Sequence, residues 1–251
     1  GSFANWWFKL TRYSYGMQGL APDEIILPEI LQKVGYTTGM LGKWHLGDRE
    51  GHLPNNFGFD YFYGALYSND MKPYELWENK NIDVKHPVDQ EQLTKKLTTK
   101  GLNFLKDWYS EYQNQPKEFK KPFFLYYAQP FPHDPLHASE NFKKSSDAGV
   151  YGDAVQELDW SLGKIVEFLK DKGQLDNTLI MISSDNGPWH EGNPGYHRGR
   201  KHQSYEGGQR VPFVVHWPKE IPKRVKTDSI AINLDVLPTV LDVLKLEKPS
   251  D

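Results

Sequence analysis

The chain has 251 residues, of which 38% are hydrophobic and 25% charged, and its 30 basic and 33 acidic residues leave a formal charge of −3. These values are those of a globular domain, and they exclude a disordered chain, a collagen-like repeat and a basic protein that coats a polyanion. The chain contains no cysteine, which excludes disulfides, thiolate metal sites and an encoded cysteine nucleophile.

The first half of the chain shows helical patterns that alternate with an apolar strand pattern. Apolar residues at helical spacing follow Asp23-Glu24 and stop at Gly35, which predicts a helix. A β-branched and apolar stretch over 36–45 predicts the first strand. Residues 51–88 are rich in Gly, Pro, Asn and aromatics and indicate a long, mostly irregular segment. A second helix is predicted from residue 93 to about residue 112.

The second half continues the alternation with three short apolar runs that are typical of buried strands. These runs cover 123–128, 178–184 and 211–217. Between the first two lies a helical stripe that ends at Gly173 and consists of Val150, Ala154, Leu158, Leu162, Ile165 and Leu169. A strand over 229–234 and a helix over 236–246 close the chain. The alternation predicts an α/β fold, with a mostly parallel central sheet sandwiched by helices.

The candidate site residues are those that follow the apolar runs, because ligands of such sheets bind beyond the carboxyl ends of the strands. Lys43 and His45 follow the first strand two residues apart, so they share a face if the strand is still extended there. His133 follows the second strand, and Asp185 and Asn186 follow the third. Together they suit an anion that is held by lysine, histidine and a metal ion.

Each candidate also has an explanation without function. A single lysine or histidine after a strand is usually a solvated loop residue, and an Asp-Asn-Gly triplet such as 185–187 is usually a turn. The basic run at 197–202 is equally compatible with a solvated loop. The coincidence of three strand ends favours a site. Asp185 and Asn186 offer only oxygen ligands, which Ca²⁺ and Mg²⁺ prefer and Zn²⁺ does not, and further carboxylates must come from elsewhere.

Six segments follow one another in a highly specific order. They are Gly42-Lys-Trp-His-Leu-Gly47, Gly58-Phe-Asp-Tyr-Phe-Tyr-Gly64, Pro122-Phe-Phe-Leu-Tyr-Tyr127 with His133 beyond, Tyr151-Gly-Asp-Ala-Val-Gln-Glu-Leu-Asp159, Ser184-Asp-Asn-Gly-Pro188, and Lys201 before Glu206-Gly-Gly208 and Arg210-Val-Pro212. This set resembles the sulfatase family, in its arylsulfatase-like branch within the alkaline-phosphatase superfamily. The resemblance runs from about residue 12 to residue 250. It implies a sulfuric ester hydrolase that cleaves sulfate monoesters of aryl or carbohydrate alcohols.

The resemblance also implies two cofactors. Sulfatases use a formylglycine, made from a cysteine or serine, whose hydrate attacks sulfur, and a metal ion and cationic side chains stabilise the sulfuryl oxygens. By motif position, Asp185 and Asn186 correspond to Ca²⁺ ligands. Mg²⁺ is the less suitable ion.

Four catalytic positions carry over in the same way. Lys43 and Lys201 correspond to cations that bind the sulfate group, and His45 to the residue that orients the formylglycine hydroxyl. His133 corresponds to the residue at the leaving oxygen, and it matches the family spacing better than His137 does.

The sequence departs from the family pattern at both ends. The family's first strand, with its paired aspartates, is absent, and Leu10-Thr-Arg-Tyr13 has no Cys/Ser-x-Pro-x-Arg segment before it. We therefore expect residues 1–251 to be a partial sulfatase-like catalytic domain, with an irregular excursion over 51–90 and without the C-terminal subdomain. As written, the chain lacks the formylglycine precursor, its arginine and about half of the metal ligands.

Two other functions stay open at this point. One is a non-catalytic sulfatase-fold protein that binds a sulfated ligand or a partner. The other is a related phosphoesterase, although Asp185-Asn186 in place of an Asp-His pair argues against it. We expect a small-molecule or carbohydrate sulfate ester as the partner, no nucleic acid and no membrane span. The oligomeric state and the compartment stay open, with a periplasmic or secreted bacterial location as the working assumption.

Overall fold

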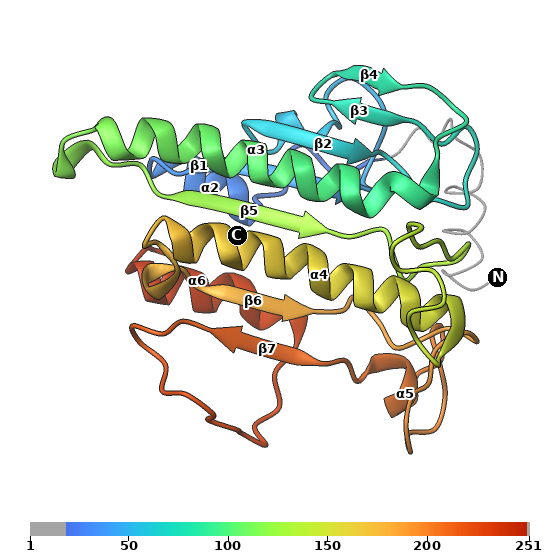
Figure 1. The fold of residues 1–251 in the computed structure, drawn as a ribbon. Helices are drawn as coiled ribbons and strands as arrows, with labels where there is room; N and C mark the ends of the chain where they lie inside the picture. Colours follow the sequence, from blue (N-terminus) through green and yellow to red (C-terminus); the bar gives the residue numbers. More distant parts are fainter. Residues whose placement is uncertain (1–18, 250–251) are drawn as a thin grey trace. The chain divides into compact units, whose positions relative to one another are not determined.

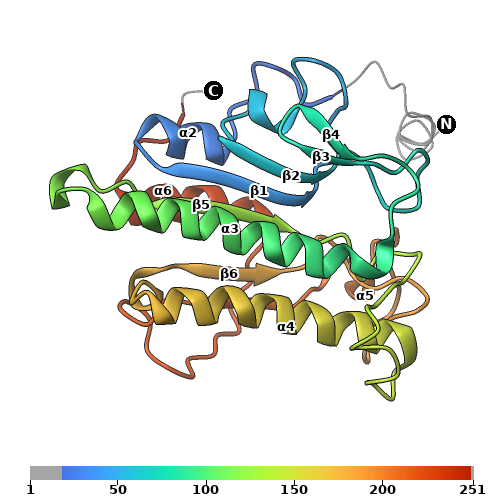
Figure 2. The same ribbon diagram turned by 45° about the horizontal axis from the view of Figure 1, so that its top comes forward.

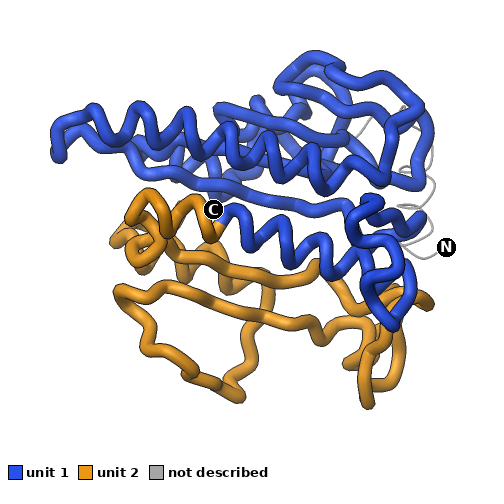
Figure 3. Tube along the Cα trace, viewed as in Figure 1, with its two compact units in different colours: residues 1–165 blue, residues 166–251 orange. Residues whose placement is uncertain are grey.

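The computed structural model describes residues 19–249, which form two compact units (Figure 3). Unit 1 ends at Ile165 and unit 2 begins at Val166, so the boundary falls inside helix α4 (Gly149–Asp171). Within the described range, unit 1 contains a five-stranded sheet and unit 2 a two-stranded sheet. Each unit therefore has its own sheet, from which its functional loops start.

The sheet of unit 1 is mixed, with parallel strands on one side and antiparallel strands on the other. Its strands in chain order are β1 (Thr37–Lys43), β2 (Tyr61–Ala65), β3 (Leu76–Glu78), β4 (Asn81–Val84) and β5 (Phe123–Ala128). They are arranged in the order β4-β3-β2-β1-β5 (Figure 1). Strand β1 is parallel to both β2 and β5, whereas β2, β3 and β4 pair antiparallel. The carboxyl ends of β1, β2 and β5 therefore lie along one edge of the sheet.

Both faces of β1 and β2 are buried, and apolar side chains cover each of them. Met40 is paired with Phe62, and the next pair is Leu41 with Tyr63. Because neighbouring residues of a strand point to opposite faces, the two pairs lie on different sides of the sheet. Each pair belongs to a separate buried cluster, and all four side chains are fully buried. Burial of a large apolar side chain contributes about 1.5–3 kcal/mol.

Helices form where the apolar spacing predicts them. They are α2 (Leu27–Lys33), α3 (Leu93–Asn114) and α4, and Figure 2 shows α2 and α3 on opposite sides of β1. Helix α4 ends before Gly173, whose φ of +64° lets the Gln174 N–H donate to the Leu169 carbonyl at 2.8 Å. No helix between residues 19 and 249 is both long and apolar enough to cross a membrane.

The structure differs from the sequence prediction over residues 51–90, where β2, β3 and β4 replace part of the expected irregular segment. The run Tyr61-Phe-Tyr-Gly-Ala65 is short and contains glycine, so its composition is close to that of a loop. In the structure it pairs with β1 along its whole length. This pairing outweighs the composition, because strand propensity depends strongly on context.

Unit 2 is built on two strands, β6 (Ile180–Ser183) and β7 (Phe213–His216), followed by helix α6 (Val236–Leu244). The sequence predicts both strands, and in the structure they pair antiparallel. The strand predicted over 229–234 is wrong. In the described part of the chain no strand pairs with it, and its Ile230 is 94% exposed.

The core of unit 1 can be tested at Leu97, which is fully buried between α3 and the sheet. Leu97→Ala should lower the free energy of unfolding by about 2–5 kcal/mol, because it removes apolar contacts and leaves a cavity. Urea unfolding followed by tryptophan fluorescence measures the change. The control Leu234→Ala removes a side chain that is 80% exposed and should change this free energy by less than about 0.5 kcal/mol. Equal losses in the two variants would contradict the assigned core.

Candidate functional site

The candidate residues of β1 follow a point where three strands approach very closely. Gly42 pairs with Gly64 of β2 and with Ala128 of β5. A Cβ atom on Gly42 would overlap the Ala128 carbonyl, and one on Gly64 would overlap the Gly42 carbonyl. The φ of +97° at Gly42 also requires glycine. Lys43 is the next residue and ends the strand.

The backbone after Lys43 no longer has strand geometry, although it stays bonded to the segment after β2. The Trp44 N–H donates to the Ala65 carbonyl at 3.0 Å, and the His45 N–H donates to the Leu66 carbonyl at 2.9 Å. His45 has a φ of +59°. The strand is no longer extended at His45, so Lys43 and His45 do not share a strand face. The hydrogen bond to the Leu66 carbonyl holds the backbone of His45 in place.

The ring of His45 packs edge-on against Tyr67. The ring centroids lie 5.8 Å apart at an angle of 90°. Burial of the Tyr67 hydroxyl raises its pKa, and the Asp48 carboxylate, to which the hydroxyl is hydrogen-bonded, raises it further. Tyr67 therefore stays protonated and donates to Asp48, which holds the phenol ring beside His45.

His133 has a defined tautomer. Its Nδ1 lies 2.6 Å from the Asp134 carbonyl oxygen and 3.4 Å from Ser68 Oγ. A carbonyl oxygen can only accept, so Nδ1 carries hydrogen and Nε2 is the nitrogen left for proton transfer. This is the arrangement that a proton donor to a leaving oxygen requires.

Ser68 is a candidate that the sequence analysis missed. It is buried and follows β2 by three residues. The rule that found Lys43 and His133, that site residues follow strand ends, would have found Ser68 as well. The composition of residues 61–65 hides the strand, and with it the strand end that Ser68 follows.

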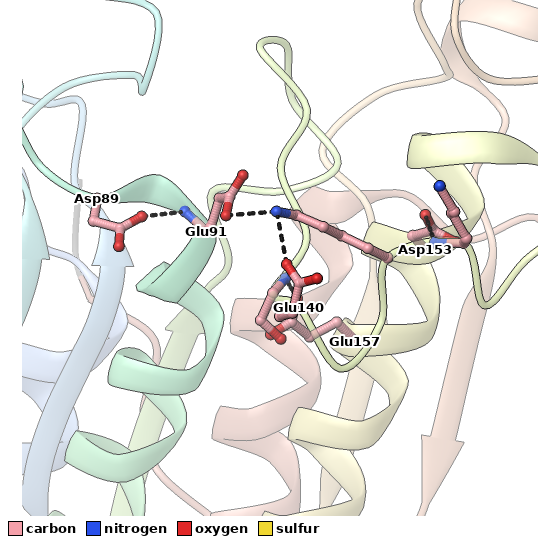
Figure 4. Close-up of polar contacts among 8 residues, drawn as sticks. Asp89, Glu91, Glu140, Asp153 and Glu157 are labelled. Atoms are coloured by element: carbon pink, nitrogen blue, oxygen red, sulfur yellow. Dashed lines mark hydrogen bonds and ion pairs between the residues drawn. The ribbon is translucent and has the colours of Figure 1, made fainter.

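The loop of residues 129–148, which carries His133, is anchored by buried carboxylates of α4. Glu157 accepts from the Ser139 N–H at 2.8 Å, and Asp153 accepts from the N–H groups of Lys144 and Ser146 at 2.8 and 2.9 Å. Lys143 adds ion pairs with Glu91 and Glu140 (Figure 4). Because an irregular loop leaves many backbone N–H groups without partners, such acceptors are needed to hold it in one conformation.

In unit 2, the structure brings the segment after β6 against residues 198–208. The Gly187 N–H donates to the Gly208 carbonyl at 2.9 Å, and a Cβ on Gly187 would overlap the Gly207 carbonyl. The Lys201 N–H donates to the Pro188 carbonyl at 3.0 Å. The backbone of Lys201 is therefore hydrogen-bonded to the chain two residues beyond Asn186.

The other basic residues of the 197–202 run have structural contacts. Arg200 donates from Nη1 to the carbonyls of Trp189 and Gly192 at 2.8 and 2.6 Å. The guanidinium of Arg198 lies 3.9 Å from the centre of the Tyr205 ring. These contacts distinguish both arginines from Lys201.

The oxygen donors of Asp185 and Asn186 fit part of a calcium sphere. Calcium takes six to eight oxygen ligands, so two residues cannot complete the sphere alone. Between residues 19 and 249 no group of three or more His, Asp or Glu side chains is placed to hold a metal ion. The pair therefore fits calcium by its chemistry and supplies a minority of the ligands.

The pKa of Asp153 gives a test of the loop anchor. Burial would raise it, but the backbone N–H groups of Lys144, Ser146 and Ser145 lower it more, so it is below the usual value. A carboxylate with a lowered pKa stabilises the fold above its unfolded pKa of about 3.9 and loses this effect as the pH falls. Asp153→Asn should lower the melting temperature at pH 7, and its difference from wild type should shrink below about pH 4.

Calorimetry across pH measures this difference, with Asp159→Asn as the control because Asp159 is an exposed residue of the same helix. A deficit of Asp153→Asn that stays constant down to pH 2 would contradict a charge-dependent anchor.

Comparison with known proteins supports the family resemblance that the ordered segments of the sequence indicate. Residues 4–246 match the family model for sulfatases. The chain is 34% identical to N-acetylgalactosamine-6-sulfatase of Mus musculus over 94% of this chain and 48% of that protein. It is 32% identical to an arylsulfatase of Hemicentrotus pulcherrimus over 93% of this chain and 45% of that protein. The chain thus spans about half the length of the curated relatives that it matches.

A solved structure shows the same fold. The crystal structure of Ps i-CgsB in complex with k-i-k-neocarrahexaose superimposes with a TM-score of 0.81 and 31% identity, over 95% of this chain and 57% of that chain. The sulfatase model covers nearly the whole chain, and the five-stranded sheet of unit 1 is mixed and has helices on both sides (Figure 2). The chain therefore belongs to the sulfatase family of the alkaline-phosphatase superfamily.

Proposed function

We propose that the protein of which this chain is part hydrolyses sulfate monoesters, and that it uses formylglycine and calcium. The main support is the contact between Ser68 and His133. It joins the segments that follow β2 and β5, the two strands that flank β1 and run parallel to it. Lys43 and His45 follow β1, so cationic and imidazole groups leave neighbouring strand ends of one unit.

In this proposal the residues of unit 1 bind the sulfate group and move a proton. The formylglycine hydrate would supply the nucleophilic oxygen that attacks sulfur. The ammonium of Lys43 would bind a sulfuryl oxygen and stabilise the charge that develops on it. His45, supported by Tyr67, would orient the nucleophile. His133 would donate the proton on Nε2 to the alcohol that leaves.

The candidate residues of unit 2 would bind the calcium ion and the sulfate group. Asp185 and Asn186 would hold Ca²⁺ together with further oxygen ligands, and the ion would act as a Lewis acid toward the sulfuryl oxygens. Lys201 would add a second cation for the sulfate group. Its backbone bond to Pro188 supports this role, since it ties the loop of Lys201 to the segment of the proposed calcium ligands.

Relatives favour a sulfated carbohydrate as the substrate class. The name N-acetylgalactosamine-6-sulfatase and the neocarrahexaose complex of Ps i-CgsB both concern sugars. A sulfated oligosaccharide is therefore the first substrate to test, and an aryl sulfate the second.

The role of Lys201 predicts a loss of catalysis. In the full-length protein, Lys201→Ala should lower kcat/KM by about 10²–10³-fold, because a preorganised charge that stabilises the transition state is removed. Release of sulfate from a sulfated oligosaccharide measures the effect. Lys223→Ala, which removes an exposed lysine of the same unit, should stay within about 3-fold of wild type.

Full activity of Lys201→Ala would contradict this role. A wild-type protein that binds both ester classes and hydrolyses neither would contradict the enzyme and favour a non-catalytic binder.

Calcium binding can be measured without activity. Calcium should raise the melting temperature of the full-length protein after treatment with EGTA, because a ligand that binds only the folded state stabilises it. Asp185→Ala should reduce this shift, and the control Asp228→Ala, at another exposed aspartate of unit 2, should keep it. A shift with zinc and none with calcium would contradict the proposed ion and favour a phosphoesterase.

A further inference from the structure

We propose that Asn69 is a positioning residue for His133, an inference that rests on the role proposed for His133 above. Asn69 is 3% exposed and is adjacent to Ser68. Its Nδ2 donates to the Pro135 carbonyl at 3.0 Å and lies 3.5 Å from the His133 carbonyl. These contacts reach the backbone on both sides of Asp134.

The carbonyl between these two positions orients the imidazole. The Nδ1–H of His133 donates to the Asp134 carbonyl, so the ring orientation depends on the course of the backbone from residue 133 to residue 135. Asn69 binds the carbonyls of His133 and Pro135 and leaves the Asp134 carbonyl for the imidazole. It thereby holds the segment that fixes the tautomer of the proposed proton donor.

Asn69 is itself held from the opposite side by Gln90. Asn69 Nδ2 lies 3.1 Å from Gln90 Oε1, and Gln90 Nε2 donates to the Asn69 carbonyl at 3.0 Å. Gln90 begins the short 3₁₀ helix η2 (Gln90–Gln92), which leads directly into α3. Because all three partners of Nδ2 are acceptors, the amide has only one orientation that satisfies them. The loop of His133 is thus tied through Asn69 to the start of a long helix.

The Oδ1 atom of Asn69 is buried and accepts no hydrogen bond from any residue in the described range. A buried acceptor without a donor costs folding free energy. The three acceptors around the NH₂ group are therefore the contacts that hold the Asn69 side chain in this orientation.

The chain offers a matched control in Asn55. Its Nδ2 donates to the Phe59 carbonyl at 3.0 Å and lies 3.5 Å from the Asp60 carbonyl and 3.2 Å from Asn79 Oδ1. Its Oδ1 is likewise buried without a partner among the described residues. Asn55 therefore makes the same three kinds of contact in the same unit, yet none of them involves a candidate site residue.

The test compares Asn69→Asp with Asn55→Asp in the full-length enzyme. Each change keeps the shape and removes the two N–H donors. Asn69→Asp should lower kcat about 30–100-fold with KM changed less than about 3-fold, because a misplaced proton donor affects the chemical step more than binding. Asn55→Asp should lower the melting temperature by a similar amount and keep kcat within about 3-fold of wild type. Gln90→Ala should lower kcat in the same direction but less, and it provides the test if Asn69→Asp does not fold.

A spectroscopic readout separates this inference from the proposed function. In wild type, ¹⁵N chemical shifts of His133 should show the Nδ1–H tautomer, and in Asn69→Asp or Gln90→Ala they should show a mixture. If wild type is inactive toward sulfate esters, the proposed function fails while the tautomer comparison still tests the positioning role. The positioning role would be overturned if Asn69→Asp and Gln90→Ala both kept the wild-type tautomer ratio and the wild-type kcat. It would also be overturned if Asn55→Asp lost as much kcat as Asn69→Asp.

Discussion

The close approach of three parallel strand ends is the constraint on which the rest of unit 1 depends. Glycine at positions 42 and 64 lets the backbones of β1, β2 and β5 meet where any side chain would overlap a neighbouring carbonyl. The segments that follow therefore leave from adjacent points, and their functional groups come together although they are far apart in the sequence. The hydrogen-bond distance between Ser68 and His133, 65 residues apart, is a direct consequence.

Buried polar side chains then give the irregular loops one conformation. A loop of about 20 residues such as 129–148 is uncommon without regular structure of its own, and its backbone groups need partners. Glu157 and Asp153 supply acceptors from α4, and Asn69 supplies donors from the segment after β2. In unit 2 a partly exposed arginine has a similar role, since Arg200 donates to the carbonyls of Trp189 and Gly192. In both units, polar side chains thus hold loops that carry candidate site residues.

Sequence reasoning succeeded where the pattern was long or fully apolar. The helical spacing of α3 and α4, the β-branched and apolar stretch of β1 and the continuous apolar run of β5 predict those elements correctly. It failed for β2 because five residues with a glycine carry little pattern, and so it missed Ser68 and Asn69 behind that strand. It also failed at 229–234, because a strand needs a partner that the local sequence does not reveal. The contacts that give Arg198 and Arg200 structural roles depend on the folded loop, so the sequence does not reveal them either.

In the proposed mechanism, Lys43 and His133 act on one sulfate ester. A crystal structure of the full-length protein with a bound sulfated oligosaccharide would show both contacts. We expect Lys43 Nζ within hydrogen-bond distance of a sulfuryl oxygen, and His133 Nε2 about 2.6–3.2 Å from the ester oxygen, with Nδ1 still bonded to the Asp134 carbonyl. A sulfate ester bound away from both residues, or a His133 ring turned so that Nδ1 faces the substrate, would contradict it.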